Sequence, residues 1–317
     1  MMNEKIAVIG SGLIGRAWAI SFARAGYQIA MTDINEDNLN QSHKIIKSSL
    51  ENLADYELLR DQSVETVLRR INKTLSVREA LDDAIYVQEN TAEVLDVKKQ
   101  VFAELDKLAE PKTVLASSTS GLMASLFTEN LDGRHRCLVA HPINPPYLVP
   151  AVELCPAPWT APDVVDKTTL IMENANHKPI RMEKEIEGFI VNRLQLALLH
   201  EAFRLVDRGY ASCEDVDKAI KDGLSHRWSF IGPFETGDLN APDGIRDYCT
   251  KFGDLIERVG QSQTENANFL GPLLDELESQ RRSVLPFEQL AERAAWRDQR
   301  LMALAVHKKN ATETLGD

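Results

Sequence analysis

Short apolar runs and one amphipathic segment alternate along the first part of the chain. The runs KIAVIG and YQIAMTD have the length and composition of buried strands, and between them SGLIGRAWAISFARAG carries apolar residues at helical spacing. This order predicts a strand–helix–strand unit in which the two strands run parallel.

The pattern then predicts more of the same sheet. A long charged stretch from about Glu36 to Arg78, rich in Leu, Lys and Glu, indicates one or two amphipathic helices that project from the sheet. The runs AIYVQE, TVLASS and CLVAH are separated by polar turns and a helical pattern, and they indicate later parallel strands. The expected fold class is α/β, with a Rossmann-type, doubly wound and mainly parallel sheet.

The character of the chain changes near Glu187. From GFIVNRLQLALLHEAFRLVDRG onward, apolar residues recur at helical spacing and strand-like runs disappear. A chain of 317 residues exceeds the length at which a single core stops growing. We therefore expect two domains: the sheet domain over residues 1–186, and an all-helical domain for substrate binding and dimerisation over residues 187–317.

Composition narrows the classes of partner. The hydrophobic share of 44% and the charged share of 26% are ordinary for a globular protein. A formal net charge of −12 repels phosphate backbones and anionic lipid, so we expect neither nucleic acid nor a membrane as a partner. The chain shows no secretory signal pattern, no long uncharged stretch and no Cys-x-x-Cys pair, so we expect a cytoplasmic protein with reduced thiols and no metal site.

Gly10, Gly12 and Gly15 form a G-x-G-x-x-G pattern between the first strand and the first helix, with Leu13 and Ile14 inside it. The first glycine permits a tight turn, the second lets backbone approach a pyrophosphate, and the third lets the helix pack closely on the strand. The free N–H groups at the start of the helix favour an anion. We therefore predict that these five residues bind a dinucleotide, rather than forming a purely structural turn.

Asp33 ends the second strand. A carboxylate at this place accepts hydrogen bonds from the ribose hydroxyls of a dinucleotide and repels a 2′-phosphate. An ordinary turn aspartate is the alternative, but its occurrence together with the glycine pattern favours the nucleotide role. The expected cofactor is NAD, and the expected class of enzyme is an NAD-dependent dehydrogenase.

A histidine and a glutamate later in the chain are candidates for the chemistry. His141 follows the apolar run CLVA, at the carboxyl end of a strand, where open α/β sheets bind their ligands. Histidine exchanges a proton near neutral pH, as alcohol oxidation requires; a histidine that only caps the strand is the alternative. Glu153 lies among apolar residues in AVELC, where an unpaired charge is costly, so we expect it to have a partner such as His141.

Three longer segments carry a family resemblance. SSTSGL, AHPINPPYLVPAVEL and GFIVNRL resemble the 3-hydroxyacyl-CoA dehydrogenase superfamily, and the resemblance extends over nearly the whole chain. Within it, DGLSHRWSFIGPFET and AERAAWRDQRL are most similar to the lambda-crystallin branch, whose enzymatic member is L-gulonate 3-dehydrogenase.

The resemblance implies roles for particular residues. His141 would be the catalytic base and Glu153 its partner, while Ser120 and Asn192 would contact the substrate hydroxyl or the nicotinamide side. From the sequence pattern alone, Ser120 would be a turn former and Asn192 a helix cap. Positions that match cofactor contacts in the family, and that rest on the resemblance alone, are Glu93, Lys98 and Asn144. Members of the family are typically dimers, so a homodimer is expected.

Two features bear on the substrate. The acyl-CoA enzymes of the family bind the nucleotide end of CoA with a serine and a lysine in the segment that here reads SSLENLADYELLRDQ. It offers Ser49, but acidic residues follow it, which disfavours CoA phosphates. Arg227, in HRWSF, matches an arginine of the lambda-crystallin and carnitine dehydrogenase branches and could pair bidentately with the carboxylate of a free acid. A structural ion pair is its alternative role.

The favoured function is NAD-dependent oxidation of the 3-hydroxyl of a small, L-gulonate-like 3-hydroxy acid to the 3-oxo acid. The enzymatic alternatives are L-carnitine dehydrogenase and short-chain 3-hydroxyacyl-CoA dehydrogenase. Trp228, Phe230 and Glu235 keep a trimethylammonium substrate open, since aromatic faces and carboxylates attract such a cation. A non-catalytic, crystallin-like NAD-binding protein is the alternative from another class.

Overall fold

The computed structural model describes residues 4–267 and 269–316, which form two compact units. The first unit extends as far as Val191 and also includes Arg297–Thr314, and the second comprises Asn192–Trp296 and, at the end of the described chain, residues 315–316. The boundary expected from the sequence, between residues 186 and 187, lies a few residues before this division. We describe each unit by itself.

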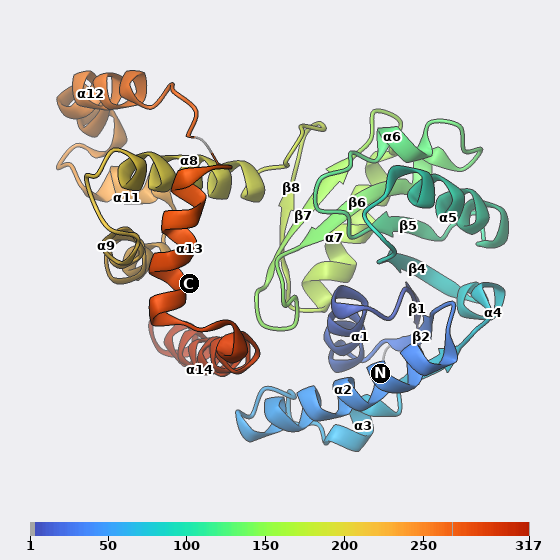
Figure 1. Ribbon diagram of the computed structural model, residues 1–317. Helices are drawn as coiled ribbons and strands as arrows, with labels where there is room; N and C mark the ends of the chain where they lie inside the picture. The colour runs from blue at the N-terminus through green and yellow to red at the C-terminus, as the bar shows by residue number, and fades with distance from the viewer. Residues whose placement is uncertain (1–3, 268, 317) are drawn as a thin grey trace. The chain divides into compact units, whose positions relative to one another are not determined.

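A single sheet organises the first unit (Figure 1). Among the described residues it has eight strands, in the order β3-β2-β1-β4-β5-β6-β7-β8, and all neighbours pair in parallel except β6 and β7. The strands are β1 (Lys5–Ile9), β2 (Gln28–Thr32), β3 (Ile71–Thr74), β4 (Ala84–Glu89), β5 (Val114–Ser117), β6 (Cys137–Pro142), β7 (Ala151–Pro156) and β8 (Lys178–Arg181). This arrangement confirms the α/β class and the opening strand–helix–strand unit.

Helices cover both faces of the sheet, which explains why its strands are apolar at successive positions. On one face of β1, Ile6 and Val8 pack into a core with Trp18 of the first helix. On the other face, Ala7 packs into a second core with Phe102. The helices of this unit are α1 (Leu13–Ala25), α2 (Glu36–Asp55), α3 (Val64–Leu68), α4 (Val77–Leu81), α5 (Leu95–Leu108), α6 (Ser125–Thr128), the 3₁₀ turn η1 (Arg134–Arg136), α7 (Pro162–Asn174) and the larger, later part of α14 (Leu290–Leu315).

The stretch from Glu36 to Arg78 differs from its prediction. It contains the expected helices α2 and α3, but it also contains the edge strand β3 and the start of α4. The strand escaped notice because only Ile71 of its four residues is buried, so no alternation of apolar and polar positions is visible.

The described residues of the second unit form helices joined by turns and loops, without a strand, as expected. Its helices are α8 (Val191–Asp207), α9 (Cys213–Lys218), the π-helical turn η2 (Ala219–Leu224), α10 (Ser225–Trp228), α11 (Pro233–Leu239), α12 (Gly244–Ser262), α13 (Pro272–Val284), the 3₁₀ turn η3 (Phe287–Gln289) and the first part of α14 (Leu290–Leu315). In the part of the chain that the structure describes, none of the helices has the length and apolar character needed to span a membrane.

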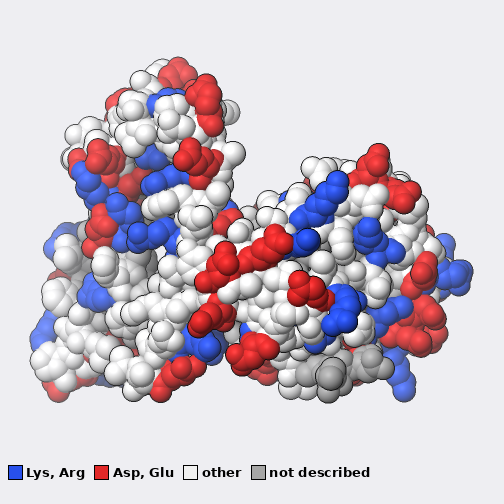
Figure 2. Space-filling view, turned by 90° about the horizontal axis from the view of Figure 1, so that it is seen from below, with Lys and Arg blue, Asp and Glu red and all other residues white. Residues whose placement is uncertain are grey.

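The face seen in Figure 2 has mixed charge, and the cysteines form no disulfide in the described part of the chain. On the face seen in Figure 2, Asp and Glu side chains lie interspersed with Lys and Arg, and no continuous basic area is visible there. All four cysteines are free thiols; Cys137, Cys155 and Cys213 are buried and Cys249 is exposed.

Candidate active site

The glycine turn is shaped by close backbone contacts. Gly10 follows β1 with φ +90°, and its N–H donates to the carbonyl of Thr32 at 2.9 Å. A Cβ on Gly10 would lie 2.8 Å from the Asn90 carbonyl oxygen, and one on Gly15 would lie 1.9 Å from the Gly10 carbonyl oxygen. A Cβ on Gly12 would meet nothing within 4 Å. Gly10 and Gly15 are therefore required by the turn itself, whereas Gly12 faces open space.

The start of α1 suits a phosphate group. Gly12 is its N-cap residue, no side chain caps the helix, and its first turn holds no acidic residue. The unpaired N–H groups of the first turn are therefore available to an anion at the positive end of a 13-residue helix. Leu13 is 59% exposed and Ile14 is partly buried beside this turn. These residues fit the pyrophosphate of a dinucleotide.

Asp33, just after β2, lies against the same turn. Its Oδ2 accepts from the Ser11 N–H at 2.8 Å and the Ser11 hydroxyl at 2.7 Å, and its Oδ1 accepts from Asn38 at 3.1 Å. Partial burial acts to raise the pKa of Asp33, but the hydrogen bonds from Ser11 and Asn38 outweigh it and hold the pKa below its ordinary value. The carboxylate is thus ionised and fixed beside the glycine turn, and its contact with a ribose stays a prediction.

Replacing Asp33 with serine should reduce the preference for NAD over NADP at least about tenfold, or roughly 1.4 kcal/mol, because the negative charge that repels a 2′-phosphate is removed. The ratio of kcat/KM for the two cofactors is the measurement. Asp37→Ser, at an acidic residue in the first turn of α2, is the matched control and should leave the ratio unchanged. Equal ratios in wild type and Asp33→Ser would contradict the role.

His141 and Glu153 face each other across the antiparallel pair β6 and β7, where they are register partners. The His141 Nδ1 and the Glu153 Oε2 are 2.7 Å apart, and the two residues are 5% and 0% exposed. Because Nδ1 is held by the carboxylate, Nε2 is the nitrogen left to accept a proton. The partner that the sequence required for Glu153 is His141.

The second oxygen of Glu153 binds the last two residues of the first unit's long segment, Ile190 and Val191. Oε1 accepts from the N–H groups of Ile190 and Val191 at 2.7 and 2.8 Å. Burial acts to raise the pKa of Glu153, but the hydrogen bonds from His141, Val191 and Ile190 prevail and lower it. Phe189, in this junction, packs on His141 with ring centroids 5.4 Å apart. Phe189 lies in the segment GFIVNRL, but nothing in that segment predicts its contact with His141.

A carboxylate also organises the loop that carries Ser120. Glu93 Oε1 accepts from the Thr119 hydroxyl, from the Ser120 N–H at 2.9 Å and from the Gly121 N–H at 3.1 Å. Ser120 itself is exposed and follows β5. The structure therefore brings Glu93 and Ser120 together, next to the end of the strand that neighbours both β4 and β6.

Lys98 is only 1% exposed, and its ammonium is bound from within the protein. It donates to both oxygens of Glu89 at 2.9 and 3.0 Å and to the Thr91 carbonyl at 3.2 Å, and its Nζ is 3.9 Å from Glu93 Oε2. Glu89 also accepts from the Ser117 hydroxyl at 2.6 Å. These contacts support the loops after β4 and β5, and a direct cofactor contact of Lys98 stays a prediction.

The remaining candidates lie at three places. Asn144 is exposed in the loop after β6 and precedes Pro145 through a cis peptide bond. Asn192 is the second residue of α8, and Arg227 is exposed on α10, both in the second unit. The guanidinium of Arg227 forms no ion pair with another residue that the structure describes.

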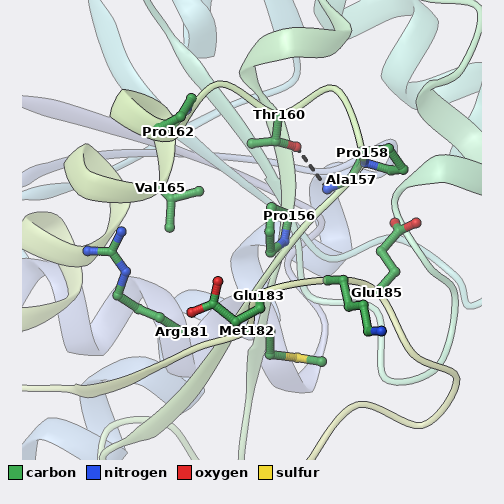
Figure 3. Close-up of a pocket in the computed structure, with 11 residues that line it drawn as sticks. Pro156, Ala157, Pro158, Thr160, Pro162, Val165, Arg181, Met182, Glu183 and Glu185 are labelled. Carbon is green, nitrogen blue, oxygen red and sulfur yellow. Dashed lines mark hydrogen bonds between the residues drawn. The ribbon is translucent and has the colours of Figure 1, made fainter.

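The candidate residues of the first unit gather at one edge of its sheet. The carboxyl ends of β1, β4, β5 and β6 carry the glycine turn, Asn90, the Ser120 loop and His141, and the strand order reverses between β1 and β4. Open α/β sheets bind ligands at this kind of edge. A hollow of about 390 Å³ at the ends of β7 and β8 is a different place (Figure 3), since none of these residues lines it.

Comparison with known proteins identifies the group to which this site belongs. The NAD binding domain of 3-hydroxyacyl-CoA dehydrogenase matches residues 5–186, and the C-terminal domain of the same enzyme matches residues 188–287. The chain belongs to the 3-hydroxyacyl-CoA dehydrogenase family. It is an NAD-dependent dehydrogenase, and the family resemblance in the sequence is confirmed.

Relatives within the 3-hydroxyacyl-CoA dehydrogenase family cover most of the chain. The lambda-crystallin homolog of Bos taurus is 41% identical over 303 residues, which are 95% of this chain and 94% of that protein. An L-carnitine dehydrogenase of Oceanobacillus iheyensis is 34% identical over 255 residues, 80% of this chain and 82% of that one. A structure of 5-formyl-3-hydroxy-2-methylpyridine 4-carboxylic acid 5-dehydrogenase shares the fold, with a TM-score of 0.80, 24% identity and coverage of 97% and 98%.

Proposed function

We propose that the protein oxidises the 3-hydroxyl of a small, L-gulonate-like 3-hydroxy carboxylic acid to the 3-oxo acid, with NAD as the hydride acceptor. The observation that carries this proposal is the buried His141–Glu153 pair at the same sheet edge as the glycine turn. A base and a dinucleotide site at one edge are the two parts that alcohol oxidation requires.

The proposed chemistry removes a hydride from C3 and a proton from the hydroxyl oxygen that C3 carries. NAD, when bound, supplies the acceptor for the hydride that leaves C3. His141 Nε2 accepts the proton of the hydroxyl as the C–O bond becomes a carbonyl, and Glu153 stabilises the resulting imidazolium through Nδ1–H. Glu153 is ionised and fixed by three hydrogen bonds, so it needs little rearrangement to meet that charge. Ser120 is proposed to bind the substrate oxygen through its hydroxyl.

Cofactor contacts proposed for Gly10, Gly12, Leu13, Ile14, Gly15 and Asp33 rest on the geometry of the turn, and those for Glu93, Lys98 and Asn144 on the family resemblance. In the second unit, Asn192 is proposed to contact the reacting oxygen and to stabilise negative charge that develops on it. Asn192 directly follows Val191, whose N–H donates to Glu153 at the start of α8.

A free acid is favoured over an acyl-CoA by the surroundings of Ser49. The side chain of Ser49 interacts with Tyr147 and acts to lower the pKa of its phenol. Glu51 and Asp55, further along α2, are exposed, and Glu51 forms an ion pair with Lys47 at 3.8 Å. A site for CoA phosphates would need unpaired basic groups here.

The substrate is tested with a panel of L-gulonate, L-carnitine, L-3-hydroxybutyrate and 3-hydroxybutyryl-CoA, each with NAD, by following NADH absorbance. We expect the highest kcat/KM with L-gulonate and the lowest with the CoA thioester. L-carnitine is the second candidate because a named L-carnitine dehydrogenase is 34% identical to this chain. A preference for the thioester would overturn the free-acid proposal.

Arg227 is proposed to anchor the carboxylate of the acid. Arg227→Met should raise KM for the acid about tenfold or more, since a charge-assisted pair contributes about 1.5–3 kcal/mol. kcat and the affinity for NADH should stay within a few-fold of wild type. Arg258→Met removes an exposed arginine from α12 and is the control. A KM that is unchanged in Arg227→Met would exclude the anchor.

We also propose a homodimer. The second unit leaves large apolar side chains exposed on two of its helices: Leu194, Leu198 and Leu199 on α8, and Phe252, Leu255, Ile256 and Val259 on α12. Exposed apolar residues gathered along helices are typical of surfaces that a second subunit covers. Light scattering after size-exclusion chromatography measures the mass, and a monomer at micromolar concentration would contradict the proposal.

A further inference from the structure

The junction between β8 and α8 holds an aromatic residue in a conformation that side chains rarely adopt. Phe189 has φ +50°, directly after Gly188 with φ +78°. Glycine adopts such angles without strain, but a bulky residue there is an outlier that the surrounding structure must enforce. Phe189 is also fully buried, at 0% exposure, so its ring is not directed to solvent.

One of the groups that hold this conformation belongs to the His141–Glu153 pair. Glu153 Oε1 accepts from the N–H groups of Ile190 and Val191, the two residues that follow Phe189. On the other side, the Phe189 N–H donates to the Ile186 carbonyl at 3.1 Å. The chain is therefore fixed on both sides of Phe189, and the carboxylate that binds His141 provides one of the two attachments.

The ring held in this way lies on the imidazole. The ring centroids of Phe189 and His141 are 5.4 Å apart, with 45° between the planes. Glu153 fixes only the Nδ1 corner of the imidazole, which leaves rotation of the ring plane about that hydrogen bond unconstrained by the pair itself. A buried aromatic face against the imidazole limits this rotation.

We propose that Phe189 is a positioning residue for His141. One carboxylate, Glu153, orients the imidazole directly through one oxygen and indirectly through the other, by holding the junction that places the Phe189 ring. The inference rests on the proposed role of His141 as the base. It adds that the geometry of the base and the start of α8, on which Asn192 is the second residue, depend on the same side chain.

Two variants test the ring separately from the backbone. Phe189→Leu keeps an apolar side chain at the strained angle, and Phe189→Gly removes both the ring and the strain. Both should lower kcat about tenfold or more, because misplacing a reacting group by a fraction of an ångström is enough for such a loss. The dissociation constant of NADH should stay within about twofold, since the cofactor contacts lie elsewhere. Asp83→Gly, which relaxes another residue with φ +56° before β4, should leave kcat unchanged.

An NMR signal can report the positioning of His141 independently of the stability of the protein and of whether the proposed reaction occurs. The proton between His141 Nδ1 and Glu153 should give a downfield ¹H resonance, assigned by its loss in His141→Asn. We expect this resonance to shift or broaden in both Phe189 variants, whether or not any acid of the panel is oxidised. In a Glu153→Gln background, Phe189→Leu should add less than its effect on kcat in wild type, since both changes act through His141.

The proposal fails if folded Phe189→Leu retains wild-type kcat and an unchanged resonance. A purely structural role would lower only the melting temperature, which is measured for every variant. If the wild type oxidises no acid but the resonance responds to the Phe189 variants, the proposed function fails while the positioning role stands.

Discussion

Replacing His141 by asparagine is expected to lower kcat about a thousandfold, with an affinity for NADH within a few-fold of wild type. Asparagine retains hydrogen-bonding groups but cannot take up a proton near neutral pH, and general base catalysis contributes about 10²–10⁴-fold to such reactions. The proposed contacts of the dinucleotide with the glycine turn and Asp33 do not involve His141. Steady-state kinetics and fluorescence titration with NADH measure the two quantities.

His177→Asn is the matched control, because His177 is also a buried histidine of the first unit. Its Nε2 is 2.7 Å from the Ser21 hydroxyl, and burial lowers its pKa to about 4, so it does not exchange protons near neutral pH. This variant should lose stability and keep kcat. If His141→Asn and His177→Asn lose turnover equally, general destabilisation explains the loss and His141 is not the base.

Replacing Gly15 by alanine should weaken NADH binding more than about tenfold and lower the free energy of unfolding by about 1–3 kcal/mol. The added Cβ would lie 1.9 Å from the Gly10 carbonyl oxygen and 3.5 Å from a methyl of Val8. Because the nearest atom is backbone, the helix must move away from β1, and the turn that faces the pyrophosphate moves with it. Titration with NADH and chemical denaturation are the measurements.

Gly12→Ala gives the complementary result. Its Cβ meets no protein atom within 4 Å, and its φ of −64° suits alanine, so the free energy of unfolding should be unchanged. NADH binding should still weaken, because the methyl group would occupy space that the pyrophosphate needs. Gly253→Ala, at an open position in α12, should change neither quantity. A stable Gly15→Ala variant with normal NADH affinity would contradict the assigned role of this turn.

The sheet could be predicted where both faces of a strand are buried, and not where they are exposed or polar. β1, β2, β4, β5 and β6 form continuous apolar runs because each face packs on its own core. β8, by contrast, has no buried residue among KPIR. β7 includes a buried glutamate, which sequence periodicity treats as an interruption although it is the partner of His141. Edge strands are therefore missed because they are exposed, and strands with functional residues are missed because a buried charge interrupts the apolar pattern.

The chemical groups of the site could be predicted from the sequence, but the contacts between residues distant in the chain could not. The glycine spacing, Asp33 and the buried charge at Glu153 each carry a local physical requirement that can be recognised in one sequence. Phe189 carries none, because its left-handed angle results from hydrogen bonds to a strand that is distant in the chain. The same holds for Lys98. A lysine on an amphipathic helix is expected to be exposed, and only the fold shows that this one is buried and bound to Glu89.

The burial of three of the cysteines has a practical consequence. Burial raises the pKa of Cys137 and of Cys155 to about 12 and also raises that of Cys213, so at neutral pH these thiols stay protonated and react slowly with alkylating reagents. Cys249 is exposed on α12. Cys249 has the helical spacing of Phe252, Ile256 and Val259, so a maleimide dye would attach at one defined position of the wild-type chain on the face that we propose a second subunit covers. Slower attachment in the dimer than in the monomer would therefore report the interface without any engineered cysteine.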